Sequence, residues 1–110
     1  MLFRSIPGVC TPTELIAALR AGRSVVKFFP AAAAGGTRMI SALSAPFPEV
    51  RFIPTGGVEE STLPDYLSLP SVAAVGGSWM VAQDLLAGQD WAEVTRRCAR
   101  AVAVAAGCRP

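Results

Sequence analysis

Four short apolar runs divide the chain into repeating units, and this repeat limits the fold more than any other feature. Each run is apolar through most of its length, as strands are when helices cover both faces of a parallel sheet. The sequence therefore predicts an α/β protein whose parallel strands each lead into a helix. The runs, bounded by proline or glycine, are residues 2–6, 24–29, 50–54 and 72–76.

Helical segments with readable ends separate the apolar runs. Thr11 to Glu14 form a capping box, Pro12 takes the first helical position, and Gly22 ends this helix. Asp90 and Glu93 mark the start of the last helix in the same way. The remaining helices are expected within residues 35–47, 59–69 and 78–88, and the last at about 90–106.

The spacing of the units favours part of a barrel. Successive strands start about 20 to 26 residues apart, which is enough for one βα unit. Four parallel βα repeats are equivalent to half of a (β/α)8 TIM barrel, which typically needs about 250 residues. A small open four-stranded sheet is the alternative, and periodicity does not separate the two. With 110 residues, the chain is predicted to form a single domain, 1–110.

Composition excludes several classes of protein. A hydrophobic fraction of 52% is too high for a disordered chain, and no apolar stretch reaches the roughly 20 residues of a membrane span. The start of the chain lacks the pattern of an export signal, so a cytoplasmic protein without membrane partners is expected. A net charge of +2 disfavours nucleic-acid binding. The cluster of Arg96, Arg97 and Arg100 is expected to complement the dipole at the end of the last helix.

The chain contains three cysteines and no histidine. Without histidine, a zinc site or a Cys-His or Ser-His catalytic pair within this chain is excluded. The cysteines are expected to be reduced thiols, and Cys10, which follows the first strand, is expected to be inert.

Lys27 is the only lysine in the chain, and it lies near the end of the second apolar run. Ligands bind at the carboxyl ends of the strands in parallel α/β folds. A neutral primary amine forms Schiff bases with carbonyl compounds, whereas a guanidinium does not deprotonate. Lys27 is therefore a candidate nucleophile. The alternative is a structural lysine that pairs with a carboxylate or extends into solvent.

Glycine pairs end the third and fourth apolar runs. Thr55 precedes Gly56 and Gly57, and Gly77 precedes Ser78. Such turns let backbone N–H groups approach an anion, which predicts a phosphate site. The alternative is ordinary tight turns that need positive φ. Glu14 is explained by its capping box rather than as a general base.

The segments IPGVCTPTEL, VKFFPA, RFIPTGG and VGGSW, in this order and spacing, resemble the class I 2-keto-3-deoxy-6-phosphogluconate (KDPG) aldolases. Members of this family often also act on 2-keto-4-hydroxyglutarate (KHG). The resemblance implies that Lys27 forms the Schiff base and that Phe29 and Thr55 contact the substrate. It also implies a (β/α)8 barrel, usually a homotrimer, that needs no metal or other cofactor. The phosphate-binding residues implied by the resemblance are Gly56, Gly57, Gly77 and Ser78.

Two features of this chain depart from the family pattern. Ala32 stands where the family usually carries a glutamate, and the chain begins near the family's fifth strand. The family's proton-transferring glutamate therefore has no counterpart here. We expect a C-terminal half of an aldolase that cleaves KDPG, weak or inactive unless a separate N-terminal half or a second copy completes the barrel. The alternatives are a non-catalytic sugar-phosphate-binding module and a remnant kept for oligomerisation.

Overall fold

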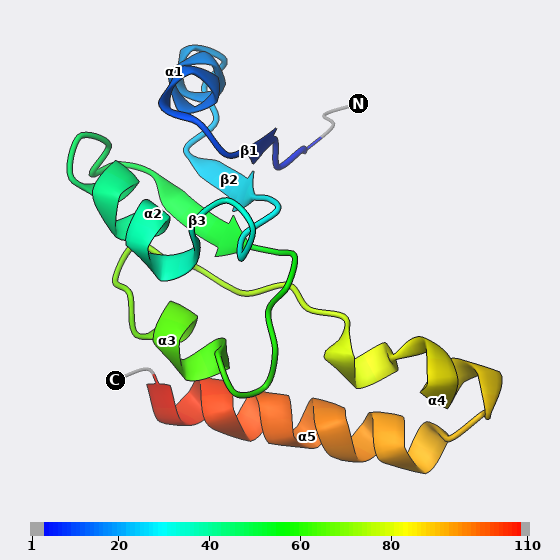
Figure 1. Ribbon diagram of the computed structural model, residues 1–110. Helices are drawn as coiled ribbons and strands as arrows, with labels where there is room; N and C mark the ends of the chain where they lie inside the picture. Colours follow the sequence, from blue (N-terminus) through cyan, green and yellow to red (C-terminus); the bar gives the residue numbers. More distant parts are fainter. Residues whose placement is uncertain (1–3, 109–110) are drawn as a thin grey trace.

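The computed structural model describes residues 4–108 and contains a three-stranded parallel sheet (Figure 1). The strands lie side by side in the order in which they follow one another in the chain. Lys27 pairs with a residue on each side, Gly8 in the first strand and Ile53 in the third. The strands are β1 (Gly8–Val9), β2 (Val25–Phe28) and β3 (Arg51–Pro54).

The predicted first strand, residues 2–6, is wrong in the part of that run that the structure describes. The first two residues of the run lie outside the described part, and the rest form no strand. The pairing of Gly8 with Lys27 accounts for residues 4–5, because it sets them opposite residues 23–24, ahead of the start of β2. These residues therefore have no neighbouring strand to pair with.

The predicted fourth strand, residues 72–76, is present only as two isolated parallel bridges. Val72 bridges to Phe52, and Gly76 bridges to Thr55. The segment thus lies along β3 without forming a regular ladder. Its composition, rich in alanine and glycine, gives little preference for an extended strand. The parallel α/β architecture is confirmed, but four regular βα repeats are not.

The first helix begins and ends where its local signals predict. α1 (Pro12–Arg20) carries a complete capping box between Thr11 and Glu14, and Gly22 follows with φ +74°. The helix expected within 78–88 is two short pieces, because Ala82 adopts an extended conformation with ψ 147°. The last helix begins after Asp90, whose carboxylate accepts a hydrogen bond from Glu93 N–H at 3.2 Å. The remaining helical elements are α2 (Gly36–Ser44), α3 (Leu63–Leu67), η1 (Trp79–Val81), α4 (Gln83–Ala87) and α5 (Trp91–Cys108).

Helices cover one face of the sheet. Side chains that alternate along β2 and β3 are buried with apolar residues of α1, α2 and α3 in a single core. The intervening positions, which point to the opposite face, are half-buried or exposed. The expectation of a sheet covered on both faces is therefore wrong for this chain. The side chains on the open face are Val25, Lys27, Arg51 and Ile53.

The C-terminal part of the chain packs loosely on this core. α5 packs against α3, η1 and α4 but has no fully buried residue. An apolar hollow of 460 Å³ lies between α5, α3 and residues 73–75. The radius of gyration is 15.1 Å, against about 13 Å for a compact domain of this length. No helix within residues 4–108 is long and apolar enough to span a bilayer.

Candidate active site

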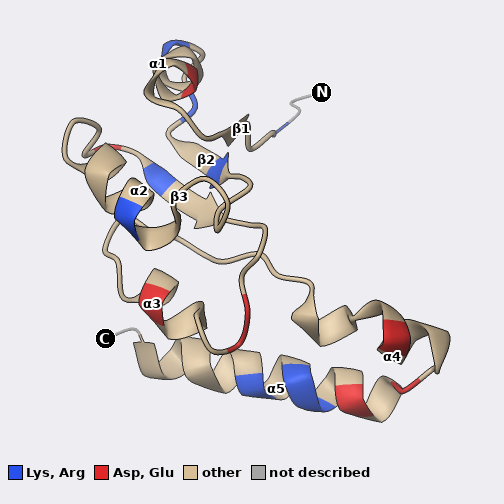
Figure 2. Ribbon diagram, viewed as in Figure 1, with Lys and Arg blue, Asp and Glu red and all other residues tan. Residues whose placement is uncertain are grey.

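Lys27 lies on the open face of the sheet, one residue before the end of β2. It is the only charged residue of β2, as the single blue segment of that strand in Figure 2 shows. Its Nζ lies 4.8 Å from the centroid of the Phe29 ring, within the range of a cation–π contact. In the described part of the chain, Lys27 takes part in no ion pair. The structural alternative of a lysine paired with a carboxylate is therefore not realised.

Gly8 leaves open space beside Lys27. It is the register partner of Lys27 on β1, and an added Cβ there would meet no other atom within 4 Å. A glycine inside a strand often marks a position where a ligand approaches the backbone closely. The sequence alone does not indicate a role for Gly8, because that role depends on the β1–β2 register, which the hydrophobic pattern does not reveal.

Hydrogen bonds tie the loop after β2 to the loop after β3. Ala31 N–H donates to the Thr55 carbonyl at 2.8 Å, and Ala32 N–H donates to the Gly56 carbonyl at 3.0 Å. In return, Thr55 N–H donates to the Phe28 carbonyl at 2.9 Å. The KFFPA and PTGG segments therefore form one continuous rim at the carboxyl ends of the strands.

The turn itself requires both glycines after Thr55. Gly56 has φ +101° and Gly57 has φ +69°, in the region that side-chain-bearing residues rarely adopt. An added Cβ at Gly57 would also lie only 2.6 Å from the Ala32 Cβ. This geometry agrees with the tight-turn alternative, so the positive φ values do not by themselves identify a phosphate site.

The GGSW segment lies beside Thr55. Gly76 bridges to Thr55, and a Cβ at Gly76 would come within 2.8 Å of the Thr55 Oγ1. Gly77 follows, with the Trp79 ring lying where its Cβ would be. Ser78 precedes η1, and its hydroxyl makes no hydrogen bond within the described residues. The two glycine turns therefore meet at one edge of the sheet, with a free hydroxyl nearby.

Glu14 is committed to the helix cap, as its position predicts. Its Oε1 accepts hydrogen bonds from Cys10 N–H at 3.0 Å, Thr11 N–H at 3.1 Å and Thr11 Oγ1 at 3.0 Å. The Cys10 backbone and then the Thr11 hydroxyl lower the pKa of this carboxyl. An ionised carboxylate with these donors is a poor base for a substrate proton.

The Cys10 thiol is not activated. Burial, followed by the hydrogen bond and charge of Glu14, raises the pKa of Cys10 above its ordinary value. Since the thiolate is the reactive form, this supports the prediction of an inert thiol. Among residues 4–108, no group of three His, Cys, Asp or Glu side chains lies close enough to hold a metal ion.

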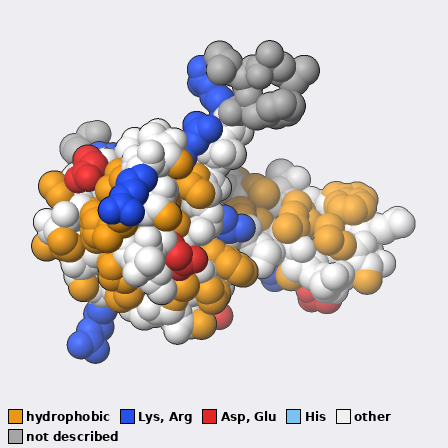
Figure 3. All heavy atoms as spheres, turned by 90° about the horizontal axis from the view of Figure 1, so that it is seen from above, with side chains coloured by type: hydrophobic (Ala, Val, Ile, Leu, Met, Phe, Trp, Pro, Cys, Tyr) orange, Lys and Arg blue, Asp and Glu red, His pale blue; other side chains and the backbone are white. Residues whose placement is uncertain are grey.

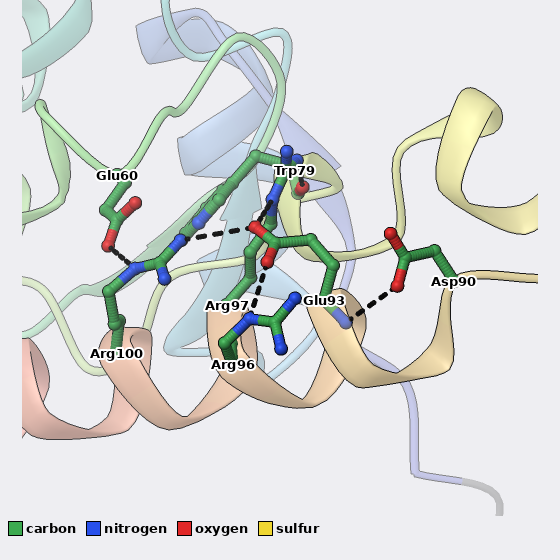
Figure 4. A network of polar contacts seen from close by, with 7 residues as sticks. All are labelled: Glu60, Trp79, Asp90, Glu93, Arg96, Arg97 and Arg100. Carbon is green, nitrogen blue, oxygen red and sulfur yellow. Dashed lines mark hydrogen bonds and ion pairs between the residues drawn. The ribbon is translucent and has the colours of Figure 1, made fainter.

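The three arginines of α5 do not act at the helix terminus. Arg96 and Arg97 donate through Nε to Glu93, at 2.8 and 3.0 Å (Figure 4). The helix-dipole interpretation is therefore wrong, and these spacings of three and four residues are the familiar helical ion-pair spacings. Both hydrogen bonds lower the pKa of Glu93, Arg97 first. The network also includes Glu60, Trp79, Asp90 and Arg100.

Known aldolases resemble this chain over most of its length. A family model for KDPG and KHG aldolase matches residues 2–97. A 2-dehydro-3-deoxy-phosphogluconate aldolase of Treponema pallidum is 51% identical over 90 residues, which cover 82% of this chain and 43% of the relative. The KHG/KDPG aldolase of Escherichia coli is 43% identical over 97 residues, covering 88% of this chain and 46% of the relative.

Solved structures give the same result. The KDPG aldolase of Legionella pneumophila, with pyruvate captured as a covalent carbinolamine intermediate, superposes with a TM-score of 0.83 at 45% identity, covering 90% of this chain and 47% of that one. The KDPG aldolase of Zymomonas mobilis with 3-phosphoglycerate superposes with a TM-score of 0.79 at 35% identity, covering 87% and 44%. The chain spans less than half the length of these relatives. Across that span its sequence and fold place it in the KDPG and KHG aldolase family.

Proposed function

We propose that this chain carries the Schiff-base lysine and the phosphate-binding loops of a class I aldolase. The substrate is KDPG, and the products are pyruvate and glyceraldehyde 3-phosphate. The observation that carries the proposal is the placement of Lys27. Its amine forms no ion pair with any of residues 4–108 and lies at the carboxyl end of β2, on the open face of the sheet and beside the space left by Gly8.

The reaction begins with attack of the neutral Lys27 amine on the C2 carbonyl of KDPG. Loss of water from the carbinolamine gives a protonated imine, which accepts electrons. A base removes the proton of the C4 hydroxyl, the C3–C4 bond breaks, and its electron pair forms an enamine of pyruvate. Glyceraldehyde 3-phosphate leaves. Protonation of the enamine at C3 and hydrolysis of the imine release pyruvate and restore the amine.

The residues around Lys27 take the remaining binding roles in this proposal. Phe29, half-exposed beside the amine, and Thr55 flank the keto acid. The phosphate group is held by backbone N–H groups and one hydroxyl, as glycine turns allow. Relatives solved with a covalent pyruvate and with 3-phosphoglycerate support this division. The phosphate ligands in the proposal are Gly56, Gly57, Gly77 and Ser78.

The proposal requires a partner for full activity. Glu14 is occupied by the capping box, and none of the open-face side chains of β2 and β3 is a carboxylate. The open sheet face also exposes Val25, and Ile6 and Phe29 are half-exposed. Apolar side chains reach the surface in several places in Figure 3. We therefore propose that a cytoplasmic N-terminal half or a second copy completes a (β/α)8 barrel, and that the completed barrel assembles as a homotrimer, as the resemblance implies.

Trapping with pyruvate and borohydride tests the proposed nucleophile. Reduction converts the imine into a stable secondary amine, which intact mass and peptide mapping then locate. We expect an adduct on the peptide that contains Lys27. Lys27→Arg is the matched control, because it keeps the positive charge but forms no imine, and any adduct that remains reports the N-terminal amine. A folded wild-type chain without an adduct on Lys27 would contradict the proposal.

A non-catalytic sugar-phosphate-binding module is the second candidate. It is favoured by the two joined glycine turns, which do not depend on Lys27, and by the commitment of Glu14 to the helix cap. This alternative predicts binding of a phosphate ester by a chain that forms no pyruvate adduct. The two assays together separate the candidates.

A further inference from the structure

We infer that Arg97 is a positioning residue that holds the Gly77–Ser78 turn, with Glu93 and Arg100 extending the same support to the Gly56–Gly57 turn. The inference rests on the proposed function in one respect, the assignment of these turns to a phosphate group. It concerns α5, which carries none of the residues proposed to bind the substrate.

Arg97 reaches the first turn through Trp79. Its Nη1 donates to the Trp79 carbonyl at 2.7 Å, across 18 residues of sequence. Trp79 directly follows Ser78, and its ring lies where a Cβ of Gly77 would be. The indole Nε1 of Trp79 is buried and has no hydrogen-bond partner among the described residues. The guanidinium of Arg97 thus fixes the backbone of Trp79, which follows Ser78 in the chain and whose ring lies beside Gly77.

Glu93 orients Arg97 for this contact. The Arg97 Nε donates to the Glu93 carboxylate at 3.0 Å, and the two side chains are only 28% and 23% exposed. A planar guanidinium donates in two fixed directions at once, toward the carboxylate and toward the carbonyl. A lysine at this position would keep the charge but lose that geometry. The role therefore depends on the shape of the arginine as well as its charge.

Arg100 contacts Glu60, which lies three residues after Gly57 in the loop after β3. Arg100 donates through Nε to the Glu60 carboxylate at 2.8 Å, and its Nη2 lies 3.7 Å from Glu93 (Figure 4). Glu93 is thus shared by Arg97, which contacts Trp79, and Arg100, which contacts Glu60. The Arg100–Glu60 pair is 49% and 37% exposed, so solvent weakens it. Arg97 should therefore matter more than Arg100.

The hollow around the hydrogen bond from Arg97 to Trp79 makes this contact hard to replace. A hollow of 580 Å³ lies between the loop after β3 and α5, lined by residues that include Glu60, Trp79, Arg97 and Arg100. Truncating Arg97 would enlarge this hollow instead of letting apolar side chains close it. The Gly77–Ser78 turn would then lose the hydrogen bond from Arg97 to Trp79, and packing would not replace it.

Titration of the 110-residue chain with glycerol 3-phosphate, followed through the backbone amide signals of Gly56, Gly57 and Gly77, tests the inference. Glycerol is the control ligand. Arg97→Ala should weaken binding about tenfold, which corresponds to about 1.4 kcal/mol. The matched variant is Arg96→Ala, which removes an arginine that binds Glu93 but reaches neither turn. It should change affinity by less than about twofold, as for an exposed pair.

Three further readouts distinguish positioning from general damage. Arg97→Lys should recover only part of the affinity, and it keeps the test open if Arg97→Ala does not fold. Pyruvate trapping on Lys27 should be unchanged in Arg97→Ala, because the amine lies on β2. Glu93→Gln should weaken phosphate binding in the same direction as Arg97→Ala, because it removes the charge that orients Arg97.

The outcomes separate this inference from the proposed function. Equal affinities in Arg97→Ala and Arg96→Ala would overturn the inference, and so would a wild-type chain that traps pyruvate but does not bind glycerol 3-phosphate. Loss of trapping in the wild-type chain would overturn the Schiff-base proposal alone. In that case a selective loss of phosphate affinity in Arg97→Ala would still support the positioning role.

Discussion

At the scale of single residues, Gly57 is fixed both by its backbone and by a neighbouring side chain. Its φ of +69° resembles the +74° of Gly22, but only Gly57 has a neighbour, the Ala32 Cβ, in the way of an added Cβ. Gly22→Ala should lower the free energy of unfolding by about 1–2 kcal/mol, the cost of a left-handed backbone. Gly57→Ala should lower it further. Urea unfolding of both variants measures the difference.

Gly8→Ala is the baseline for this pair of variants. Gly8 has no positive φ, and an added Cβ meets nothing within 4 Å, so stability should change little. Equal losses in Gly57→Ala and Gly22→Ala would mean that the Ala32 loop moves aside without cost. That result would show that the rim formed by the loops after β2 and β3 yields to an added side chain.

At the scale of elements, local signals predict more than pairing signals do. α1 and the start of α5 were predictable, because a cap is defined by residues three positions apart. The strands at 2–6 and 72–76 were not, because strand limits depend on the register of a partner far away in sequence. The break at Ala82 had no proline or glycine to mark it.

In the candidate site, too, local signals were predictable and contacts between distant segments were not. Lys27 and the glycine turns were predictable, since they lie at the ends of apolar runs and carry distinctive residue types. The spacing of Glu93 and Arg97 was a readable signal, but nothing in the sequence indicates that Arg97 reaches Trp79. Gly8 likewise lies beside Lys27 only because of the pairing between β1 and β2. The features of the site that the sequence did not predict are therefore contacts between segments that lie far apart in the chain.

The cap of α1 should make stability depend on pH. Hydrogen bonds from the Cys10 backbone and from Thr11 lower the pKa of Glu14 in the folded state. A lowered folded pKa stabilises the protein above the unfolded value, about 4.3, and this stabilisation disappears as pH falls through the folded value. Melting temperatures measured from about pH 6 to about pH 3 should therefore fall less steeply in Glu14→Gln than in the wild type.

Glu49→Gln is the matched control for this measurement. Glu49 is exposed and makes no hydrogen bond or ion pair in the described part of the chain. Its variant should follow the wild-type pH profile. Glu93, whose pKa is lowered mainly by Arg97 and Arg96, should contribute a loss in the same acidic range. A Glu14→Gln profile that coincides with the wild type would show that the capping carboxylate does not contribute to the pH dependence.

At the scale of the whole molecule, the chain has an open shape for its length. Helices cover one face of the sheet, while Val25 and Ile53 lie on the uncovered face beside Lys27. β1 is also an edge strand, with β2 on one side only. An unpaired strand edge and exposed apolar side chains such as Val25 both favour association with another polypeptide. The surface that would bind such a partner is the surface that carries the proposed nucleophile.

Complementation tests whether that partner completes the site. The part of the Escherichia coli KHG/KDPG aldolase that precedes its matched region is mixed with this chain, and formation of pyruvate from KDPG is measured. We expect cleavage in the mixture to exceed that of this chain alone by about 10²–10⁴, the usual contribution of general acid–base catalysis. The increase should vanish when this chain carries Lys27→Arg, because the mixture would then lack the amine that forms the imine.

Equal rates with and without the added part, in a mixture shown to associate, would mean that the open face accepts a partner without gaining a base from it. The chain would then act as a binding module.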